Sequence, residues 1–273
     1  MNKIINTAAQ LLEEIRNKKP LVHNITNYVT VNDCANAVLA IGASPIMADD
    51  IEEAADIAAI SSALVINIGT LNKRTIESML SAGKRANESG IPVIFDPVGA
   101  GASTLRNETT RAILSNIRLT VLRGNLSEIS YIAGISANTK GVDASEADIA
   151  ANDGKAAAIA AAEKLGCVVA ITGAEDIITD GKRIAVISNG HRMLSNVTGT
   201  GCMTTALVGS FCGAGQDAFA AAVGGIAAMG IAGEIAYENA GSKGNGSFHM
   251  AIIDAVSQLD SKIFLERAKI YEA

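Results

Sequence analysis

Several short stretches of the chain are hydrophobic along their whole length rather than at alternate positions. The segment 63–68, for example, reads Ala-Leu-Val-Ile-Asn-Ile. Strands with this pattern are buried on both faces, which is typical of a parallel sheet covered by helices on each side. We therefore predict strands over Ala43–Ala48, Ala63–Gly69, Pro92–Asp96, Leu119–Arg123 and Cys167–Thr172.

Segments with helical periodicity separate these strands. The predicted helices are Met1–Lys18, Val31–Ile41, Ile51–Ile60, Lys73–Glu88, Leu105–Asn116 and Ser145–Leu165. Regular alternation of strand and helix predicts a doubly wound α/β sandwich with a mostly parallel sheet.

After Thr172 the pattern changes. Asp176–Thr179 and Lys182–Ser188 flank Asp180-Gly181, which predicts a β-hairpin. A glycine-bearing loop follows, then long helices to about Ala240 and a helical end from Gly246.

The 273 residues contain no Pro/Gly/Ser-rich linker, so we predict a single domain over residues 1–273. Hydrophobic residues make up 49% of the chain and charged residues 18%, enough for a large core. Because aromatic residues make up only 3%, the core must be built from Ala, Ile, Val and Leu.

Charge and cysteine usage narrow the class of function. A net charge of -6 argues against a nucleic-acid partner, because binding to nucleic acid favours a basic surface. The four cysteines form no CxxC pair and no zinc-type cluster, which indicates reduced thiols and a cytoplasmic protein. The N-terminal segment lacks the apolar region of a signal peptide. The uncharged segment Ala218–Gly233 is shorter than the roughly 20 residues of a membrane span, so we predict a buried helix and no membrane.

Ligands of open parallel sheets bind beyond the carboxyl ends of the strands. In this chain, glycine and polar residues are found at those predicted strand ends. They are Met47-Ala48-Asp49, Gly69-Thr70, Asp96-Pro97-Val98-Gly99, Arg123-Gly124-Asn125 and Thr172-Gly173.

The loop Thr198-Gly199-Thr200-Gly201-Cys202 opens a predicted helix. Glycines let the backbone approach a ligand closely, and the first N–H groups of a helix attract anions. Such a loop could hold a phosphoryl group during transfer; a plain helix-capping turn is the alternative. The chain has no Walker A motif and no GxGxxG after its first strand, which argues against a dinucleotide-dependent oxidoreductase.

Two carboxylates and one guanidinium are candidates for binding metal and phosphate. Asp96 ends a buried strand, where a carboxylate is costly unless it binds something, and magnesium held through water is one candidate. A helix N-cap is the other interpretation of Asp96. Arg123 could pair with phosphate as a planar fork. Glu128 follows Asn125 by three residues, so the two could instead form a capping pair. His23 is given no catalytic role.

Six motifs, in this order and spacing, resemble the hydroxyethylthiazole kinase family, ribokinase-like enzymes of thiamin biosynthesis and salvage. They are Val22-His23-Asn24-Ile25-Thr26-Asn27, Pro45-Ile46-Met47-Ala48, Asn67-Ile68-Gly69-Thr70-Leu71, Asp96-Pro97-Val98-Gly99-Ala100, Arg123-Gly124-Asn125 and Gly199-Thr200-Gly201-Cys202.

The resemblance implies a three-layer α/β/α sandwich that phosphorylates the hydroxyethyl alcohol of a thiazole with ATP and Mg²⁺. It further implies a homotrimer with active sites between subunits, so that Met47 and Asn24 could serve a neighbour's site. The implied roles are substrate binding by Met47, Gly199, Asn24 and Gly69, ATP binding by Arg123 and Thr172, magnesium binding through water by Asp96 and Glu128, and an anion hole formed by Gly199, Thr200, Gly201 and Cys202.

Cys202 stands where sugar kinases of the wider superfamily carry an aspartate base. A helix N-terminus lowers the pKa of a thiol, but a thiolate is a modest base for an alcohol proton. Phosphoryl transfer depends mainly on positioning and charge neutralisation. We therefore expect Cys202 to orient the hydroxyl in a direct in-line transfer, and to accept its proton late if at all.

Three alternatives stay open at this point. One is a related kinase, for example of hydroxymethylpyrimidine. Another is an ATP- or ADP-dependent repair dehydratase with the same fold. The third is a non-catalytic protein that binds thiazole or nucleotide, because fold does not determine function.

Overall fold

The computed structural model describes residues 3–135 and 146–272. Within these residues, nine strands form one sheet in the order β2-β1-β3-β4-β5-β6-β7-β8-β9. Neighbours from β2 to β6 pair in parallel, whereas β7, β8 and β9 pair antiparallel. The strands are β1 (Leu21–Ile25), β2 (Ser44–Ile46), β3 (Ala63–Asn67), β4 (Val93–Asp96), β5 (Val121–Gly124), β6 (Val168–Ile171), β7 (Asp176–Thr179), β8 (Ile184–Ile187) and β9 (Ile270–Glu272).

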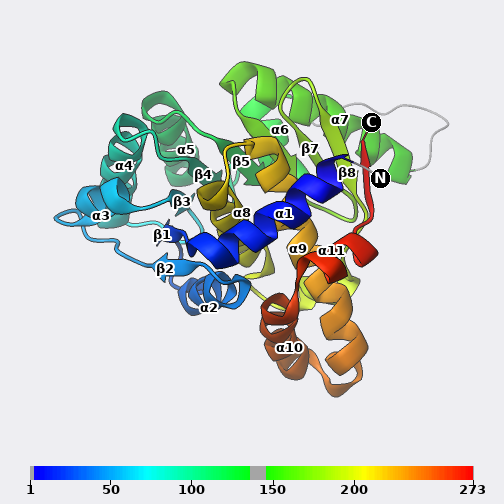
Figure 1. Cartoon of the computed structure of the whole chain (residues 1–273). Coiled ribbons are helices and arrows are strands. Elements are labelled where there is room, and N and C mark those ends of the chain that lie inside the picture. Colours follow the sequence, from blue (N-terminus) through cyan, green and yellow to red (C-terminus); the bar gives the residue numbers. More distant parts are fainter. Residues whose placement is uncertain (1–2, 136–145, 273) are drawn as a thin grey trace.

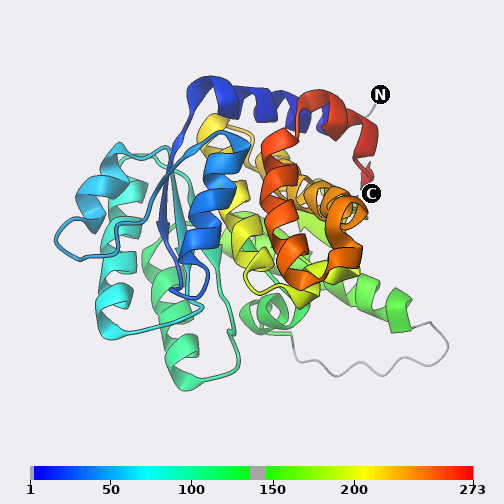
Figure 2. The same cartoon turned by 90° about the horizontal axis from the view of Figure 1, so that it is seen from below.

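Helices cover both faces of this sheet (Figure 1). In Figure 2, α4 and α5 lie on one side of the sheet, and α8 and α10 lie on the other. The α-helices are α1 (Lys3–Lys18), α2 (Val31–Ile41), α3 (Ala54–Ile60), α4 (Lys73–Glu88), α5 (Thr104–Asn116), α6 (Leu126–Ala133), α7 (Glu146–Leu165), α8 (Thr200–Ala214), α9 (Ala218–Ala240), α10 (Asn245–Gln258) and α11 (Ser261–Arg267). The short 3-10 helices are η1 (Arg192–Asn196) and η2 (Gly241–Lys243).

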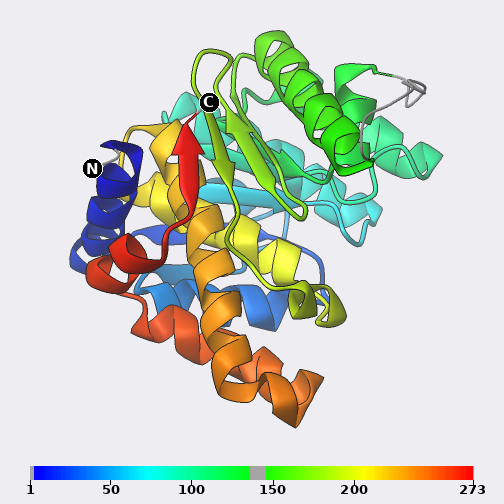
Figure 3. The same cartoon turned by 90° about the vertical axis from the view of Figure 1, so that its right-hand side faces the viewer.

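Side chains of each central strand alternate between two hydrophobic cores. Val65 and Ile94 face the core built with α1, α2, α8 and α9, whereas Leu64 and Phe95 face the core built with α4 to α7. Figure 3 shows α7 and α9 on opposite sides of the strands. Because both faces are covered, most strand positions are hydrophobic, and the polar exceptions in β3 and β4 are the last residues, Asn67 and Asp96. The predicted three-layer arrangement is confirmed.

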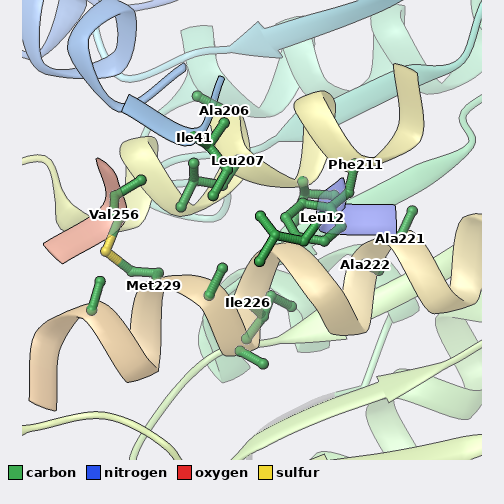
Figure 4. Packing of buried hydrophobic residues seen from close by; sticks show 14 of the residues in the cluster. Leu12, Ile41, Ala206, Leu207, Phe211, Ala221, Ala222, Ile226, Met229 and Val256 are labelled. Carbon is green, nitrogen blue, oxygen red and sulfur yellow. The ribbon is translucent and has the colours of Figure 1, made fainter. Parts of the chain in front are cut away.

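Small residues let α8 and α9 pack closely. A side chain at Gly225 would lie 2.7 Å from the backbone of Val208, so only glycine fits there. Figure 4 shows Leu207 and Phe211 of α8 packed near Ile226 and Met229 of α9. The segment Ala218–Lys243 is long and apolar enough to cross a membrane, but 83% of its most apolar window is buried inside the protein. The prediction of a buried core helix is confirmed.

Most predicted elements are observed with shifts of a few residues at their ends. The helices Val31–Ile41 and Lys73–Glu88 have the predicted bounds. The strand predicted over Ala43–Ala48 is shorter and covers only Ser44–Ile46. Strands β1 and β9 were not predicted. Met1 and Ser145, the first residues of two predicted helices, lie outside the described residues.

Candidate active site

The carboxyl ends of β3, β4 and β5 bring polar side chains together at one edge of the sheet. Asn67 of β3 stands beside Asp96 of β4 in the strand register. Arg123 lies near the end of β5, and Thr172 follows the last residue of β6. As the strand-end rule predicted, Asp96, Arg123 and Thr172 lie together at this edge, and their roles stay predictions.

Asp96 is the most buried carboxylate of this group, with 1% of its surface exposed. Its Oδ2 accepts hydrogen bonds from Asn67 Nδ2 at 2.9 Å and Thr205 Oγ1 at 2.8 Å, and it lies 3.5 Å from Arg123 Nη1. Its Oδ1 has no partner among the described residues. Burial raises the pKa of Asp96 to about 6, against the lowering effect of Arg123 and the two hydrogen bonds.

Arg123 bridges the ends of β4 and β6. Its Nη1 faces Asp96, and its Nη2 donates to Thr172 Oγ1. A side chain at Gly201 would lie 2.9 Å from Nη1, so the first turn of α8 lies directly against the guanidinium. Arg123 and the first turn of α8 therefore direct a cation and backbone N–H groups toward the same space.

The loop that opens α8 depends on glycine for its shape. Gly199 is the N-cap of α8 and has a φ of 89°, in the left-handed region that favours glycine. A side chain at Gly199 would lie 2.6 Å from Thr30 Cγ2. Thr200 closes the loop through a hydrogen bond from its Oγ1 to the Leu194 carbonyl, at 3.1 Å. The anion-binding role of this loop stays a prediction, and a plain helix-capping turn stays the alternative.

Cys202 lies in the first turn of α8 and is partly exposed. Its Sγ accepts hydrogen bonds from Asn27 Nδ2 and Asn67 Nδ2, both at 3.3 Å. The two amides are linked by a 3.0 Å hydrogen bond from Asn27 Nδ2 to Asn67 Oδ1. Two donors aimed at one sulfur favour a fixed position for it. No role was predicted for Asn67, although it opens one of the six motifs and its amide stands at the end of a buried strand.

The predicted acceptor-binding residues divide into two groups. Gly69 lies beside Cys202's partners, because a side chain there would meet Asn27 and Asn67 within 3.0 Å. Asn24 is buried in β1, and its Oδ1 has no partner among the described residues. Met47 follows β2 at the sheet edge, and β1 separates it from β3. Within one chain, the structure therefore brings Gly69 to Cys202 and leaves Met47 farther along the edge.

Glu128 forms the capping pair that was the alternative interpretation. Asn125 accepts from the Glu128 backbone N–H at 2.9 Å, and Glu128 Oε2 accepts from the Asn125 N–H at 2.8 Å. Its Oε1 accepts from the Gly99 N–H at 2.7 Å. Both carboxylate oxygens thus accept hydrogen bonds from backbone N–H groups. A magnesium-bound water must therefore donate to their remaining lone pairs.

A cavity of about 640 Å³ opens beside this edge of the sheet. Arg123, Thr172 and Gly201 line its polar end. Apolar surface comes from η1 and α9 through Leu194, Ile226, Met229 and Gly230. A cavity of this size that joins polar donors to an apolar wall suits a nucleotide.

Asp176 also lines this cavity and was not predicted as a site residue. Its Oδ1 accepts from the Gly173 N–H at 3.0 Å. Burial raises the pKa of Asp176 to about 7, although the Gly173 hydrogen bond and the charge of Arg123 lower it. The raised pKa means that ionised Asp176 destabilises the free protein.

We expect Asp176→Asn to stabilise the ligand-free protein at pH 8. The asparagine Oδ1 can keep the Gly173 hydrogen bond, and the buried charge is removed. Because the folded pKa of about 7 exceeds the ordinary value of 3.8, the cost is absent below pH 4 and complete above pH 7. The expected gain is about 4 kcal/mol at pH 8 and below about 1 kcal/mol at pH 4. Urea unfolding at both pH values measures it, and an equal gain at both would contradict it.

Comparison with known proteins decides the family. The model of the hydroxyethylthiazole kinase family matches residues 12–262. The chain belongs to the hydroxyethylthiazole kinase family. A hydroxyethylthiazole kinase from Ruminiclostridium cellulolyticum is 72% identical over 272 residues, covering 100% of each chain. One from Methanocella arvoryzae is 46% identical over 260 residues, 95% of this chain and 96% of the relative.

Solved structures support the same family assignment. The hydroxyethylthiazole kinase protein from Pyrococcus horikoshii has a TM-score of 0.89 and 40% identity, covering 97% of this chain and 98% of that chain. A Staphylococcus aureus pyridoxal kinase in complex with ADP has a TM-score of 0.60 at 17% identity, over 80% of this chain and 88% of that chain, which shows the ribokinase-like fold alone. The predicted hydroxyethylthiazole kinase family, fold and kinase class, with its use of ATP, are confirmed.

Proposed function

We propose that this protein transfers the γ-phosphate of ATP to the hydroxyethyl alcohol of 4-methyl-5-(2-hydroxyethyl)thiazole, in thiamin biosynthesis or salvage. One observation carries the proposal. Asn67 donates to both Cys202 and Asp96, Asp96 faces Arg123, and Arg123 lines a cavity that suits a nucleotide. Full-length similarity to hydroxyethylthiazole kinases supports the choice of the thiazole alcohol as acceptor.

In the proposed reaction the acceptor hydroxyl attacks the γ-phosphorus while the bond to the bridging oxygen of ADP breaks. Arg123 and the N–H groups of Thr200, Gly201 and Cys202 offset the charge of the transferred group. Cys202, fixed by Asn27 and Asn67, orients the hydroxyl and can accept its proton late in the transfer. Thr172 holds Arg123 in position. One displacement predicts inversion at a chiral γ-phosphate; retention would exclude the mechanism.

The residues fit a magnesium ion held through water. The described residues contain no cluster of three His, Cys, Asp or Glu side chains that could hold a metal alone. Asp96 Oδ1 is a buried acceptor without a partner, and carboxylate oxygens suit magnesium-bound water. Glu128 could accept such a water through its free lone pairs. Bound to ATP, magnesium supplies charge neutralisation and orients the phosphates.

A homotrimer and a cytoplasmic location complete the proposal. Several apolar side chains are exposed on the loop after β1, on α2 and on α10, and α2 packs against α10. They are Tyr28, Val29, Leu39 and Met250. If a neighbouring subunit covers them, Met47 and Asn24 could complete its site. Light scattering of the purified protein tests the trimer.

The first test is ADP release from ATP and Mg²⁺ with three acceptors: the thiazole alcohol, hydroxymethylpyrimidine and a small sugar. Turnover with the thiazole alone supports the proposal. Turnover with the pyrimidine or sugar instead would keep the kinase and reject the acceptor. No turnover with any of them, or turnover only with a hydrated nicotinamide cofactor, would favour a binding protein or a repair enzyme.

Variants of Cys202 test its role. We expect kcat of Cys202→Ala to fall by no more than about 100-fold. Loss of a general base typically costs about 10²–10⁴-fold, so this expected loss is at the low end of that range. Cys202→Asp should be tolerated or improved, because a carboxylate can accept from the same Asn27 and Asn67 donors. Steady-state kinetics with the thiazole alcohol measures both. Near-total loss of kcat in both variants would make the thiol itself essential.

A further inference from the structure

Arg106 connects two loops of the site. It lies in none of the six motifs, and no role has been assigned to it above. It lies in the first turn of α5, behind the loops that follow β3 and β4. Its Nη1 donates to the carbonyls of Ile68 and Val98, and its Nη2 donates to the carbonyl of Gly69 at 2.7 Å. One planar guanidinium thus holds three carbonyls from two loops.

The connection fixes a peptide group from both ends. The Val98 carbonyl accepts from Arg106, and the N–H of the same peptide, on Gly99, donates to Glu128 Oε1. Gly99 has a φ of 73°, and a side chain there would lie 3.0 Å from Arg106 Cδ. The backbone just after Asp96 is therefore held between Arg106 and Glu128.

The other end of the connection reaches the acceptor side. Gly69, whose carbonyl Arg106 holds, donates its N–H to Asn67 Oδ1 at 2.8 Å. Asn67 in turn donates to both Asp96 and Cys202. Arg106 takes part in none of the ion pairs found among residues 3–135 and 146–272. Its hydrogen bonds go to backbone carbonyls at the site, which is the arrangement of a positioning residue.

We propose that Arg106 is a positioning residue for the acceptor, which holds the Gly69 loop in register with Asp96 and Cys202. The kinetic part rests on the proposed function. Arg123 and Thr172, on β5 and after β6, make no hydrogen bond to Arg106 or to the carbonyls that it holds, and Arg123 meets this connection only at Asp96. We therefore expect the KM for ATP to depend little on Arg106. A general structural role would affect both substrates alike.

Arg106→Met removes the donors and keeps most of the apolar stem. We expect kcat/KM for the thiazole alcohol to fall about 100-fold, because small misplacements near reacting atoms have effects of that order. The KM for ATP should stay within about twofold of the parent. Arg106→Lys should be intermediate, since an ammonium lacks the planar fork that holds both loops. Arg111→Met, an exposed arginine on the same helix, is the matched control and should behave as the parent.

Amide hydrogen exchange gives a readout that needs no turnover. In Arg106→Met, peptides covering residues 67–72 and 97–102 should exchange faster, whereas those covering 121–125 and 168–173 should not. Unchanged exchange in the first pair, or an equal rise in the KM of both substrates, would overturn the proposal. If the parent does not turn over the thiazole alcohol, the proposed function fails, and exchange still decides the role of Arg106.

Discussion

Asp96→Asn should lower kcat by about 10²–10³-fold, the range for loss of a key electrostatic group in an active site. The reason is chemical rather than structural. An asparagine amide oxygen can replace Oδ2 and accept from Asn67 and Thr205. The amide nitrogen would then take the place of Oδ1, which has no partner among the described residues. The neutral amide cannot balance Arg123 or accept from magnesium-bound water.

We expect Asp96→Asn to fold normally, so that a lower kcat reports on the chemistry and not on unfolding. Burial disfavours the ionised carboxylate and raises the pKa of Asp96 to about 6, so a neutral isostere removes a cost at neutral pH. The melting temperature of Asp96→Asn at pH 8 should be at or above that of the parent. Asp56→Asn, on the exposed surface of α3, is the matched control. A kcat within tenfold of the parent at saturating Mg²⁺ would remove Asp96 from the mechanism.

The fold could be predicted where hydrophobic pattern and burial agree. The strands β3 to β6 are apolar except near their carboxyl ends, and both of their faces are covered by helices. Strand β1 was missed because it contains His23 and Asn24, both buried. His23 Nε2 lies 2.6 Å from the Ala48 carbonyl, a partner 25 residues away. A polar residue satisfied by tertiary contact cannot be distinguished from a loop residue in the sequence.

The candidate site could be predicted where it follows from strand ends. Asp96 and Arg123 meet because parallel strands finish at one edge of the sheet. The amides on Cys202 and the Arg106 connection could not be predicted in this way. Cys202 is 175 residues from Asn27 and 135 from Asn67, and their contact depends on how α8 packs against β1 and β3. Glu128 shows the reverse, since its capping role was readable from spacing alone.

Arg123→Met should lower both ATP use and the stability of the fold. Without the guanidinium, the buried carboxylates Asp96 and Asp176 lose the cation that lowers the pKa of each. Removing one partner of a buried ion pair costs about 3–5 kcal/mol. We also expect kcat/KM for ATP to fall about 10²–10³-fold, since the charge facing the phosphates is gone. Urea unfolding without ATP or Mg²⁺ and initial-rate kinetics measure the two effects.

The sign of the pH dependence separates charge from shape. In Arg123→Met the pKa of both carboxylates rises further, so the folded state binds more protons and stability falls as pH rises. The loss should therefore be large at pH 8 and small at pH 5, where both groups are protonated. Arg123→Lys keeps the charge without the fork, so its stability loss should depend less on pH while ATP use is still impaired. If both variants lost the same stability at pH 5 and pH 8, packing of the arginine stem, rather than its charge, would hold this edge together.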